Sequence, residues 1–280
     1  MPDETTYNKV LGDLRAAITT LKPGQPIYDE AVAHRDQVLA KYGPIFSTDH
    51  VANLSKDEFT SFLYSENNHH WSGLNRMGLQ AAADMDMLRK ALAALLDETK
   101  PIQERLPLVL GMVGGIGKAT ATAILTVAYP DVYGVWNNTS EGALRKVGLW
   151  PHFGKGDSVG AKYAKVNNLL AKFRLGLGTD FWTLDSLWWF LLTPQGAAVP
   201  PPASQASSGS LSQISGSFGL ERQLEEFLLE NWDRTSLAGE WDIYRTPEDP
   251  EAGNQFPTDV GPVDILAVHK EAAPFLGDRT

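Results

Sequence analysis

An aspartate near the C-terminus lies within an apolar run. The run Val263-Asp264-Ile265-Leu266-Ala267-Val268 is rich in β-branched residues and predicts a buried strand. Alternation along a strand lets Asp264 face one way while Val263 and Ile265 pack against a core. An isolated carboxylate is costly to bury among apolar neighbours, and carboxylates held in such places are often functional. The pattern therefore marks Asp264 as a candidate ligand for a hard cation such as Mg²⁺.

A second candidate is a glycine-rich turn in the middle of the chain. Val113-Gly114-Gly115-Ile116-Gly117-Lys118-Ala119-Thr120-Ala121 predicts a turn between one helix over Leu106–Met112 and another over Lys118–Ala128. Glycines allow close backbone approach, and the start of a helix offers free N–H groups and a positive dipole end to a phosphate. Candidate DNA-binding residues are therefore Gly115, Gly117, Lys118 and Thr120. An ordinary tight turn between two helices remains the alternative.

The turn resembles the helix-hairpin-helix motif of DNA-repair proteins over residues 106–129, which implies binding of a DNA backbone without reading of sequence. No Gly-Lys-Ser/Thr step occurs, so the turn is not a Walker A loop. Pro130–Trp136 extends the resemblance towards the helix-hairpin-helix glycosylases. The catalytic aspartate of those enzymes falls on Asn137, and their lysine nucleophile falls on Ala119. The resemblance thus implies binding without glycosylase chemistry.

Two blocks at the C-terminal end carry a further resemblance. Gly219–Asn231, which reads GLERQLEEFLLEN, and Gln255–Ala267, which reads QFPTDVGPVDILA, resemble in order and spacing the NucS (EndoMS) C-terminal nuclease domain. That family has the PD-(D/E)xK, restriction-endonuclease-like fold and cuts DNA with Mg²⁺ or Mn²⁺. The resemblance implies that Glu221 is its helix glutamate, that Asp264 is its metal-ligand aspartate, and that Gly261 allows close backbone approach.

The next step of that active site, Glu-x-Lys, has no counterpart after Asp264, where the only lysine is Lys270. We therefore expect the chain to be a fragment that ends before this strand, binds Mg²⁺ weakly and does not cut DNA alone. A charge that suits a helix N-terminus is the alternative for Glu221. A non-catalytic DNA-binding or scaffold protein with a remnant nuclease tail is the alternative function, and a small-molecule or protein-interaction module is a third.

Two aromatic clusters each have a structural and a functional interpretation. In Glu66-Asn67-Asn68-His69-His70-Trp71, adjacent histidines point in different directions and make a poor metal pair, so we expect His70 and Trp71 to tether a loop. Phosphate or base contact by this cluster, with Arg76 beyond it, is the alternative. The tryptophan-rich segment Phe181–Leu192 predicts core, and a base-stacking platform is its alternative.

Charge and composition limit the classes of protein. The net charge of −10 argues against simple nucleic-acid binding. Residues 219–280, however, hold 5 Lys+Arg against 14 Asp+Glu, whereas residues 101–178 hold 9 against 4, so the middle of the chain is locally basic. Cysteine is absent, which excludes disulfides and thiolate chemistry. No apolar run reaches the roughly 18–20 residues of a membrane span, and the acidic N-terminus is no signal peptide, so we expect a cytoplasmic protein without membrane contact.

The chain divides into three parts by pattern. Residues 1–193 predict a mainly α domain that contains the helix-hairpin-helix-like turn, and residues 194–218, rich in Pro, Gly, Ala, Ser and Gln, predict a flexible linker. Residues 219–280 predict a partial α/β, restriction-endonuclease-like domain. The expected elements there are a helix over Leu220–Leu228, a strand over Trp241–Tyr244, a turn-rich stretch over Thr246–Asn254 and the strand over Val263–Val268. DNA is the expected partner, and a homodimer is left open.

Overall fold

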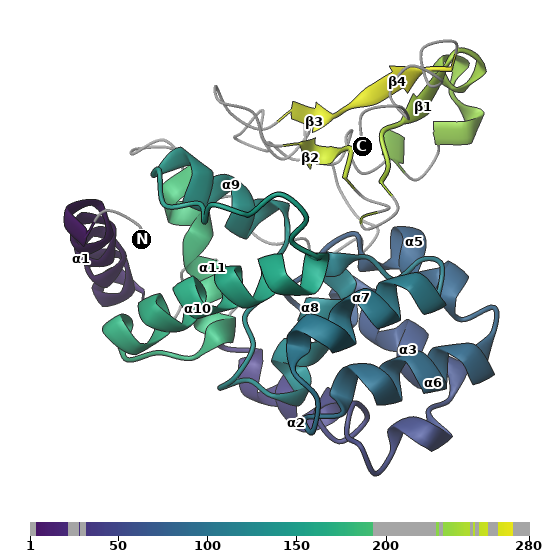
Figure 1. Cartoon of the computed structure of the whole chain (residues 1–280), viewed down its shortest axis with the longest axis horizontal. Coiled ribbons are helices and arrows are strands. Elements are labelled where there is room, and N and C mark those ends of the chain that lie inside the picture. Colours follow the sequence, from purple (N-terminus) through teal and green to yellow (C-terminus); the bar gives the residue numbers. More distant parts are fainter. Residues whose placement is uncertain are drawn as a thin grey trace, which may run out of the picture.

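The computed structural model describes residues 4–21, 28, 32–192, 228–229, 232–246, 249, 252–256 and 263–270, without the side chains of residues 189, 190, 254 and 255. The described part is mainly helical, with two small two-stranded sheets near the C-terminal end (Figure 1). The predicted linker at 194–218 lies outside the described residues, as does most of the helix expected over Leu220–Leu228.

The helices follow one another through the first 192 residues. They are α1 (Glu4–Thr20), α2 (Arg35–Tyr42), α3 (Lys56–Leu63), α4 (Ser65–Asn68), α5 (Leu74–Ala81), α6 (Met85–Leu96), α7 (Ile102–Met112), α8 (Lys118–Ala128), α9 (Asn138–Lys146), α10 (Val159–Leu177) and α11 (Phe181–Leu192). Short 3₁₀ turns lie at Val51–Asn53, Trp232–Arg234 and Ser236–Gly239.

Local sequence signals placed many of these helices. The predicted helix over Lys118–Ala128 is confirmed as α8, and α11 has the bounds of the predicted tryptophan-rich segment. Ser55 caps α3, accepting from the Glu58 N–H while the Glu58 carboxylate accepts from the Ser55 N–H over 2.8 Å, as a capping box requires. The short helices α4 and α5 carry too few apolar repeats to be found by periodicity, and the sequence did not predict them.

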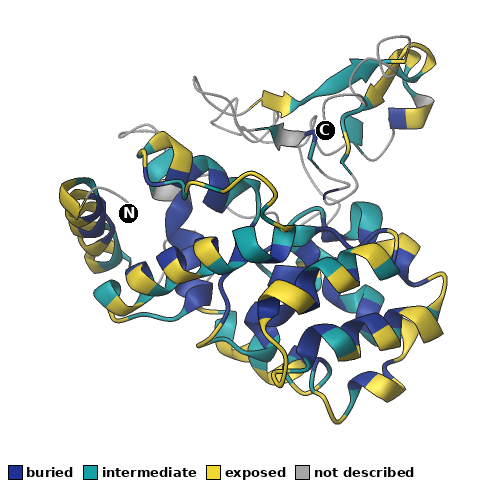
Figure 2. Ribbon diagram, viewed as in Figure 1, coloured by how far each residue is buried: buried dark blue, intermediate teal, exposed yellow. Residues whose placement is uncertain are grey.

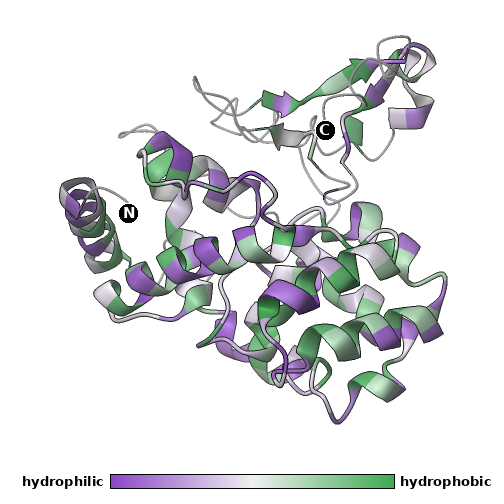
Figure 3. Cartoon of the chain, viewed as in Figure 1, coloured by the Kyte–Doolittle hydropathy of each residue, from purple (hydrophilic) through white to green (hydrophobic). Residues whose placement is uncertain are grey.

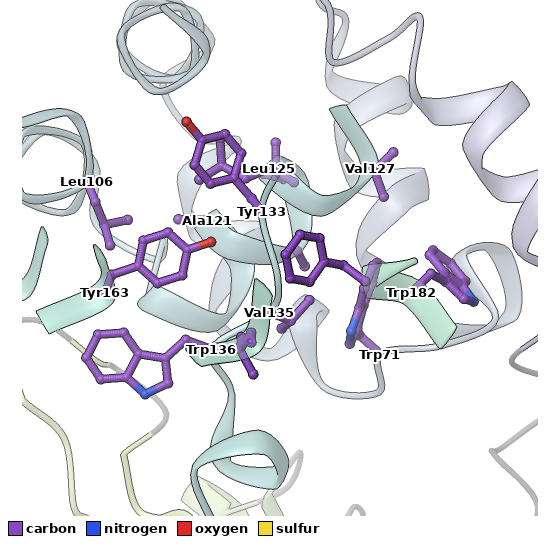
Figure 4. Packing of buried hydrophobic residues seen from close by; sticks show 14 of the residues in the cluster. Trp71, Leu106, Ala121, Leu125, Val127, Tyr133, Val135, Trp136, Tyr163 and Trp182 are labelled. Atoms are coloured by element: carbon purple, nitrogen blue, oxygen red, sulfur yellow. The ribbon is translucent and has the colours of Figure 1, made fainter. Parts of the chain in front are cut away.

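The core is shared by almost all the helices. Its largest fully buried side chains include Trp182, Trp188, Tyr42, Tyr163 and Phe173. Figure 2 shows buried residues where the helices face one another, and Figure 4 shows Trp136, Tyr133, Tyr163, Trp71 and Trp182 within this packing. Trp182 and Trp188 are 0% and 1% exposed, so the prediction of core is confirmed for them and a stacking platform is wrong.

A buried arginine ties α7 to the segment after α8. Arg105 is 2% exposed, and its guanidinium lies 2.6 Å from Glu98 Oε1 and donates to the Tyr133 hydroxyl. The Tyr133 hydroxyl in turn donates to Glu98 Oε1 over 2.7 Å. Burial, and then the hydrogen bond to Glu98, raises the pKa of Tyr133 to about 12. A buried cation is tolerable here because it has both a carboxylate and a hydroxyl partner.

The C-terminal strands are β1 (Trp241–Ile243), β2 (Asn254–Phe256), β3 (Val263–Ile265) and β4 (Ala267–His269). The predicted strand over Val263–Val268 exists as two short strands because its partner changes at Leu266. β3 pairs antiparallel with β2, and β4 pairs antiparallel with β1. At the junction, the Leu266 N–H donates to the Gly253 carbonyl over 2.7 Å and the Leu266 carbonyl accepts from the Tyr244 N–H over 2.8 Å.

Two expectations for this region are wrong. Asn254 ends the stretch predicted as turn, yet it begins β2. Val263 does not pack in a core, since it is 41% exposed, and Asp264 is exposed beside it while Ile265 is half-buried. The penalty for burying a carboxylate therefore does not act on Asp264 in this structure, because two strand pairs of three residues each give no apolar layer to cover it.

The glycine turn between α7 and α8 packs against α5. Gly115 has φ +90°, a left-handed conformation that favours glycine, and residues 115–117 are buried. A Cβ at Gly115 would overlap the Met77 carbonyl oxygen and lie 3.0 Å from the Gln80 Cβ. The glycine therefore serves close packing of one helix against another. Figure 3 shows hydrophobic and hydrophilic residues mixed along the helices, whereas α8 itself is buried from Thr120 to Val127.

Among the described residues, no helix is both long enough and apolar enough to cross a membrane.

We expect Gly115→Ala to lower the free energy of unfolding by roughly 2–4 kcal/mol, because left-handed strain and a steric overlap add. Gly148 is the matched control, since it has φ +73° but nothing within 4 Å of an added Cβ. Gly148→Ala should cost only the strain, about 1–2 kcal/mol. Urea unfolding followed by circular dichroism measures both changes. Equal losses would show that Gly115 is not packed as described.

Candidate nucleic-acid interface and nuclease residues

The four residues predicted to grip DNA lie close together in the chain but are mostly covered. Gly115 and Gly117 are buried, and Thr120 is 3% exposed, so its hydroxyl does not face solvent. Gly117 is the N-cap residue of α8, has extended backbone and makes no side-chain capping hydrogen bond. Lys118, the first residue of α8, is half-buried. The structure thus shows a tight turn between two helices and leaves Lys118 as the one charged group of this set.

Lys118 faces the chain's own carboxylates. Its ammonium donates to Asp249 Oδ2 and lies 3.9 Å from Glu141 Oε2 and 5.3 Å from the centre of the Trp136 ring. Asp249 belongs to the segment between β1 and β2 and is 5% exposed. A carboxylate suits this place because it meets the Lys118 ammonium in a charge-assisted hydrogen bond. The group predicted to hold a phosphate is therefore already occupied by an internal anion.

The surroundings of Lys118 come from α9. Glu141 accepts from Trp136 Nε1–H over 2.9 Å, and its other oxygen accepts from Arg145 over 2.8 Å. Asn137, the position that corresponds to the glycosylase aspartate, is the N-cap of α9 and accepts from the Ser140 N–H over 2.8 Å. Its role in the structure is helix capping. An Asn followed three residues later by Ser could have revealed this cap in the sequence.

The histidine cluster holds a loop in place. His70 Nε2–H and Trp71 Nε1–H both donate to Asp185 Oδ2 of α11, over 3.0 and 2.9 Å. Buried Asn68 accepts from the backbone N–H groups of His70 and Trp71, and its amide donates to the carbonyls of Phe62 and Trp71. The predicted tethering role of His70 and Trp71 is confirmed. Asp185 itself was not predicted, because its partners are more than a hundred residues away.

Two neighbours of this loop are also packed within the protein. His69 ends α4 with φ +54° and stacks on His34, with ring centres 4.3 Å apart. Burial, followed by the charge of His34, lowers the pKa of His69. Arg76 folds back over Gly73, where an added Cβ would lie 3.0 Å from its guanidinium carbon. Both side chains therefore contact other parts of the protein.

The two predicted nuclease carboxylates are not both described. Glu221 and Gly261 lie outside the described residues. Asp264 is the central residue of β3 and is exposed. No group of three or more His, Cys, Asp or Glu side chains that could hold a metal ion occurs among the residues the structure describes. Of these nuclease residues the structure therefore places Asp264, in the middle of a paired strand.

Comparisons with protein-family models, with curated proteins and with solved structures gave no match to this chain.

Replacement of Asp185 separates its hydrogen bonding from its charge. Asp185→Ala leaves two buried donors, on His70 and Trp71, without an acceptor, and should lower the free energy of unfolding by roughly 3 kcal/mol. Asp185→Asn keeps one acceptor oxygen but sets an amide NH2 where Oδ1 is buried without a hydrogen-bond partner, so it should cost less, roughly 1–2 kcal/mol. Chemical denaturation measures both variants. An equal loss for the two would mean that the negative charge, rather than the acceptor, holds the loop.

The contact between Lys118 and Asp249 should control how firmly the C-terminal strands are held. We expect Asp249→Asn to speed amide hydrogen exchange in residues 241–246 and 252–256 by roughly 10-fold, because loss of a half-buried ion pair lowers the cost of local opening. Asp242→Asn is the control, because Asp242 also pairs with a lysine, Lys270, but at 3.7 Å and with an exposed side chain. Unchanged exchange in the Asp249 variant, or the same increase in both, would contradict this role.

Proposed function

We propose that this protein binds DNA and is an endonuclease of the NucS-like type. It would hydrolyse phosphodiester bonds with a divalent metal ion when its nuclease domain carries a Glu-x-Lys step. The proposal rests on the resemblance of Gly219–Asn231 and Gln255–Ala267 to that nuclease domain. Its DNA-binding part rests on the resemblance of residues 106–129 to the helix-hairpin-helix motif and on the basic middle of the chain.

The observation that carries the nuclease proposal is the position of Asp264. This carboxylate lies in the centre of a paired strand, between Val263 and Ile265, and its side chain is exposed. A strand holds a carboxylate more rigidly than a loop does, and exposure leaves the group accessible to an ion and to a DNA phosphate. Hard divalent ions prefer such oxygen ligands. The position thus supports the role that the resemblance implies for Asp264.

Asp264 and Glu221 would hold the metal ion, which would polarise the scissile phosphate and generate hydroxide from water. A single carboxylate binds Mg²⁺ weakly, because Mg²⁺ retains much of its water shell and needs several anionic oxygens for tight binding. Residues between Asp264 and Thr280 contain no Glu-x-Lys sequence. The proposal therefore assigns hydrolysis only to a domain that supplies this step, whose lysine would stabilise charge or help to activate water.

The turn before α8 supports DNA binding with one condition. Lys118 and the N-terminus of α8 suit a phosphate chemically, but Lys118 is paired with Asp249. A DNA phosphate can reach Lys118 only if the Asp249 carboxylate leaves it. Lys118→Glu is a poor test of this role, because it would set a third carboxylate beside Asp249 and Glu141. Lys118→Gln removes the charge and keeps a polar side chain that is only one atom shorter.

We expect the 280-residue chain to bind duplex DNA at low salt and to lose roughly 10- to 150-fold in affinity between 50 and 200 mM salt, the loss for two to four phosphate contacts. We also expect weak Mg²⁺ binding and no cleavage, because the Glu-x-Lys step is missing from residues 264–280. Fluorescence anisotropy, isothermal titration calorimetry and a plasmid-nicking assay measure these properties. Asp264→Asn should leave DNA affinity unchanged and weaken Mg²⁺ binding further.

The outcomes separate the enzyme from its alternative. Absence of salt-dependent DNA binding would contradict the proposal as a whole. Mg²⁺-dependent cleavage that Asp264→Asn abolishes would show that this chain already holds a complete nuclease centre. If a chain extended after Thr280 by a Glu-x-Lys strand binds DNA but never cleaves it with Mg²⁺ or Mn²⁺, the non-catalytic DNA-binding or scaffold protein is the better description.

A further inference from the structure

The connection between α9 and α10 concentrates positive charge in an acidic chain. Residues 145–165 hold five Lys and Arg side chains and one acidic side chain, Asp157, whereas the whole chain has a net charge of −10. We call this segment the α9–α10 surface. Its cations are Arg145, Lys146, Lys155, Lys162 and Lys165. Charge of one sign on one segment favours an oppositely charged partner.

Contacts join these cations across an aromatic ridge. The Arg145 guanidinium lies 4.9 Å from the centre of the Trp150 ring, and Trp150 meets Phe153 edge-on at 5.7 Å. On the far side of the ridge, the Lys165 ammonium lies 6.0 Å from the Phe153 ring centre. Cations of α9 and α10 therefore belong to one continuous surface.

The ridge itself is firmly packed. Trp150 and Phe153 are half-buried, and both rings lie against Trp136, at 6.0 and 6.4 Å between centres. Trp136 stacks in turn on Tyr163 of the core, at 6.4 Å and an interplanar angle of 4°. The ridge thus positions charges, and a cation already lies over each of its rings, Arg145 over Trp150 and Lys165 over Phe153. A partner that is recognised by its charge fits this surface better than one that is recognised by stacking of its bases.

Part of the charge is not neutralised within the protein. Lys165 pairs with Asp157 at 2.6 Å, which lowers the pKa of Asp157, and Arg145 pairs with Glu141. Lys155 is exposed and Lys162 half-buried, and neither makes an ion pair or a side-chain hydrogen bond with any described residue. The charge of Lys162 contributes to the lowered pKa of Asp157 without a direct ion pair, so both lysines can meet a phosphate without breaking one.

We propose that the α9–α10 surface binds the phosphate backbone of nucleic acid without reading its sequence, with Lys155 and Lys162 as direct phosphate contacts. The inference rests on the proposed DNA-binding function and gives it a surface next to the α7–α8 turn, where Lys118 is paired with Asp249. An anionic lipid surface fits less well, because the aromatic side chains are packed against one another and cannot insert into a bilayer.

The test compares two double variants of the full chain with equal charge change. Lys155→Gln with Lys162→Gln removes the proposed contacts. Lys56→Gln with Lys90→Gln is the control, because both lysines are exposed on α3 and α6 and make no described ion pair. Anisotropy with two duplexes of unrelated sequence, at several salt concentrations, gives affinity and salt slope. Circular dichroism and thermal unfolding check that all variants are folded.

We expect the first double variant to bind both duplexes roughly 10-fold more weakly and its salt slope to fall by about 1.8, since each phosphate contact contributes about 0.9. The control should change affinity less than about 2-fold, with its slope intact. Equal effects of the two variants, or no effect of the first, would overturn the assignment while leaving DNA binding itself established. Failure of the unmodified chain to bind DNA would instead overturn the proposed function. Tighter binding to phosphatidylserine vesicles than to DNA, lost in the first variant, would assign the surface to lipid and overturn the proposal.

Discussion

The hydrogen bonds that Asp185 accepts from His70 and Trp71 fix the loop that precedes α5. The glycine turn of α7 and α8 packs directly on α5, at Met77 and Gln80. One loop and one short helix therefore connect a carboxylate on α11 to the glycine turn that precedes Lys118. Buried hydrogen bonds of this kind constrain the structure strongly. A buried donor without an acceptor has lost its hydrogen bonds to water and gained none within the protein.

At Lys118, the attraction between a cation and an anion could hold the protein's own segments together or bind a ligand. A helix N-terminus with a lysine attracts any anion, and in this protein the anion is Asp249, from the segment between β1 and β2. An internal carboxylate has a large advantage over an external phosphate, because it is held nearby by the chain and its binding costs no loss of translational freedom. The neighbouring α9–α10 surface differs, since its excess of cations over carboxylates leaves positive charge facing solvent.

The C-terminal strands illustrate how pairing decides the meaning of a hydrophobic run. Residues 263–268 keep extended backbone, but Leu266 passes the chain from β2 to β1. Gly253 permits this crossing, because a Cβ there would lie 2.6 Å from the Tyr244 carbonyl oxygen and 2.7 Å from that of Leu266. Each sheet is then too small to cover Val263 or Asp264, so Asp264 is accessible where the run alone predicted burial.

The sequence by itself determined the features that depend on neighbours in the chain. It predicted the helix over Lys118–Ala128, which is α8, and the burial of the tryptophan-rich segment of α11, because such signals act over a few neighbouring residues. It also selected the glycine turn, Lys118 and Asp264 as residues of interest. Only the tertiary structure decided their surroundings. The partners of His70 and Lys118 lie 115 and 131 residues away, and no local spacing specifies which distant carboxylate will meet a given cation or donor.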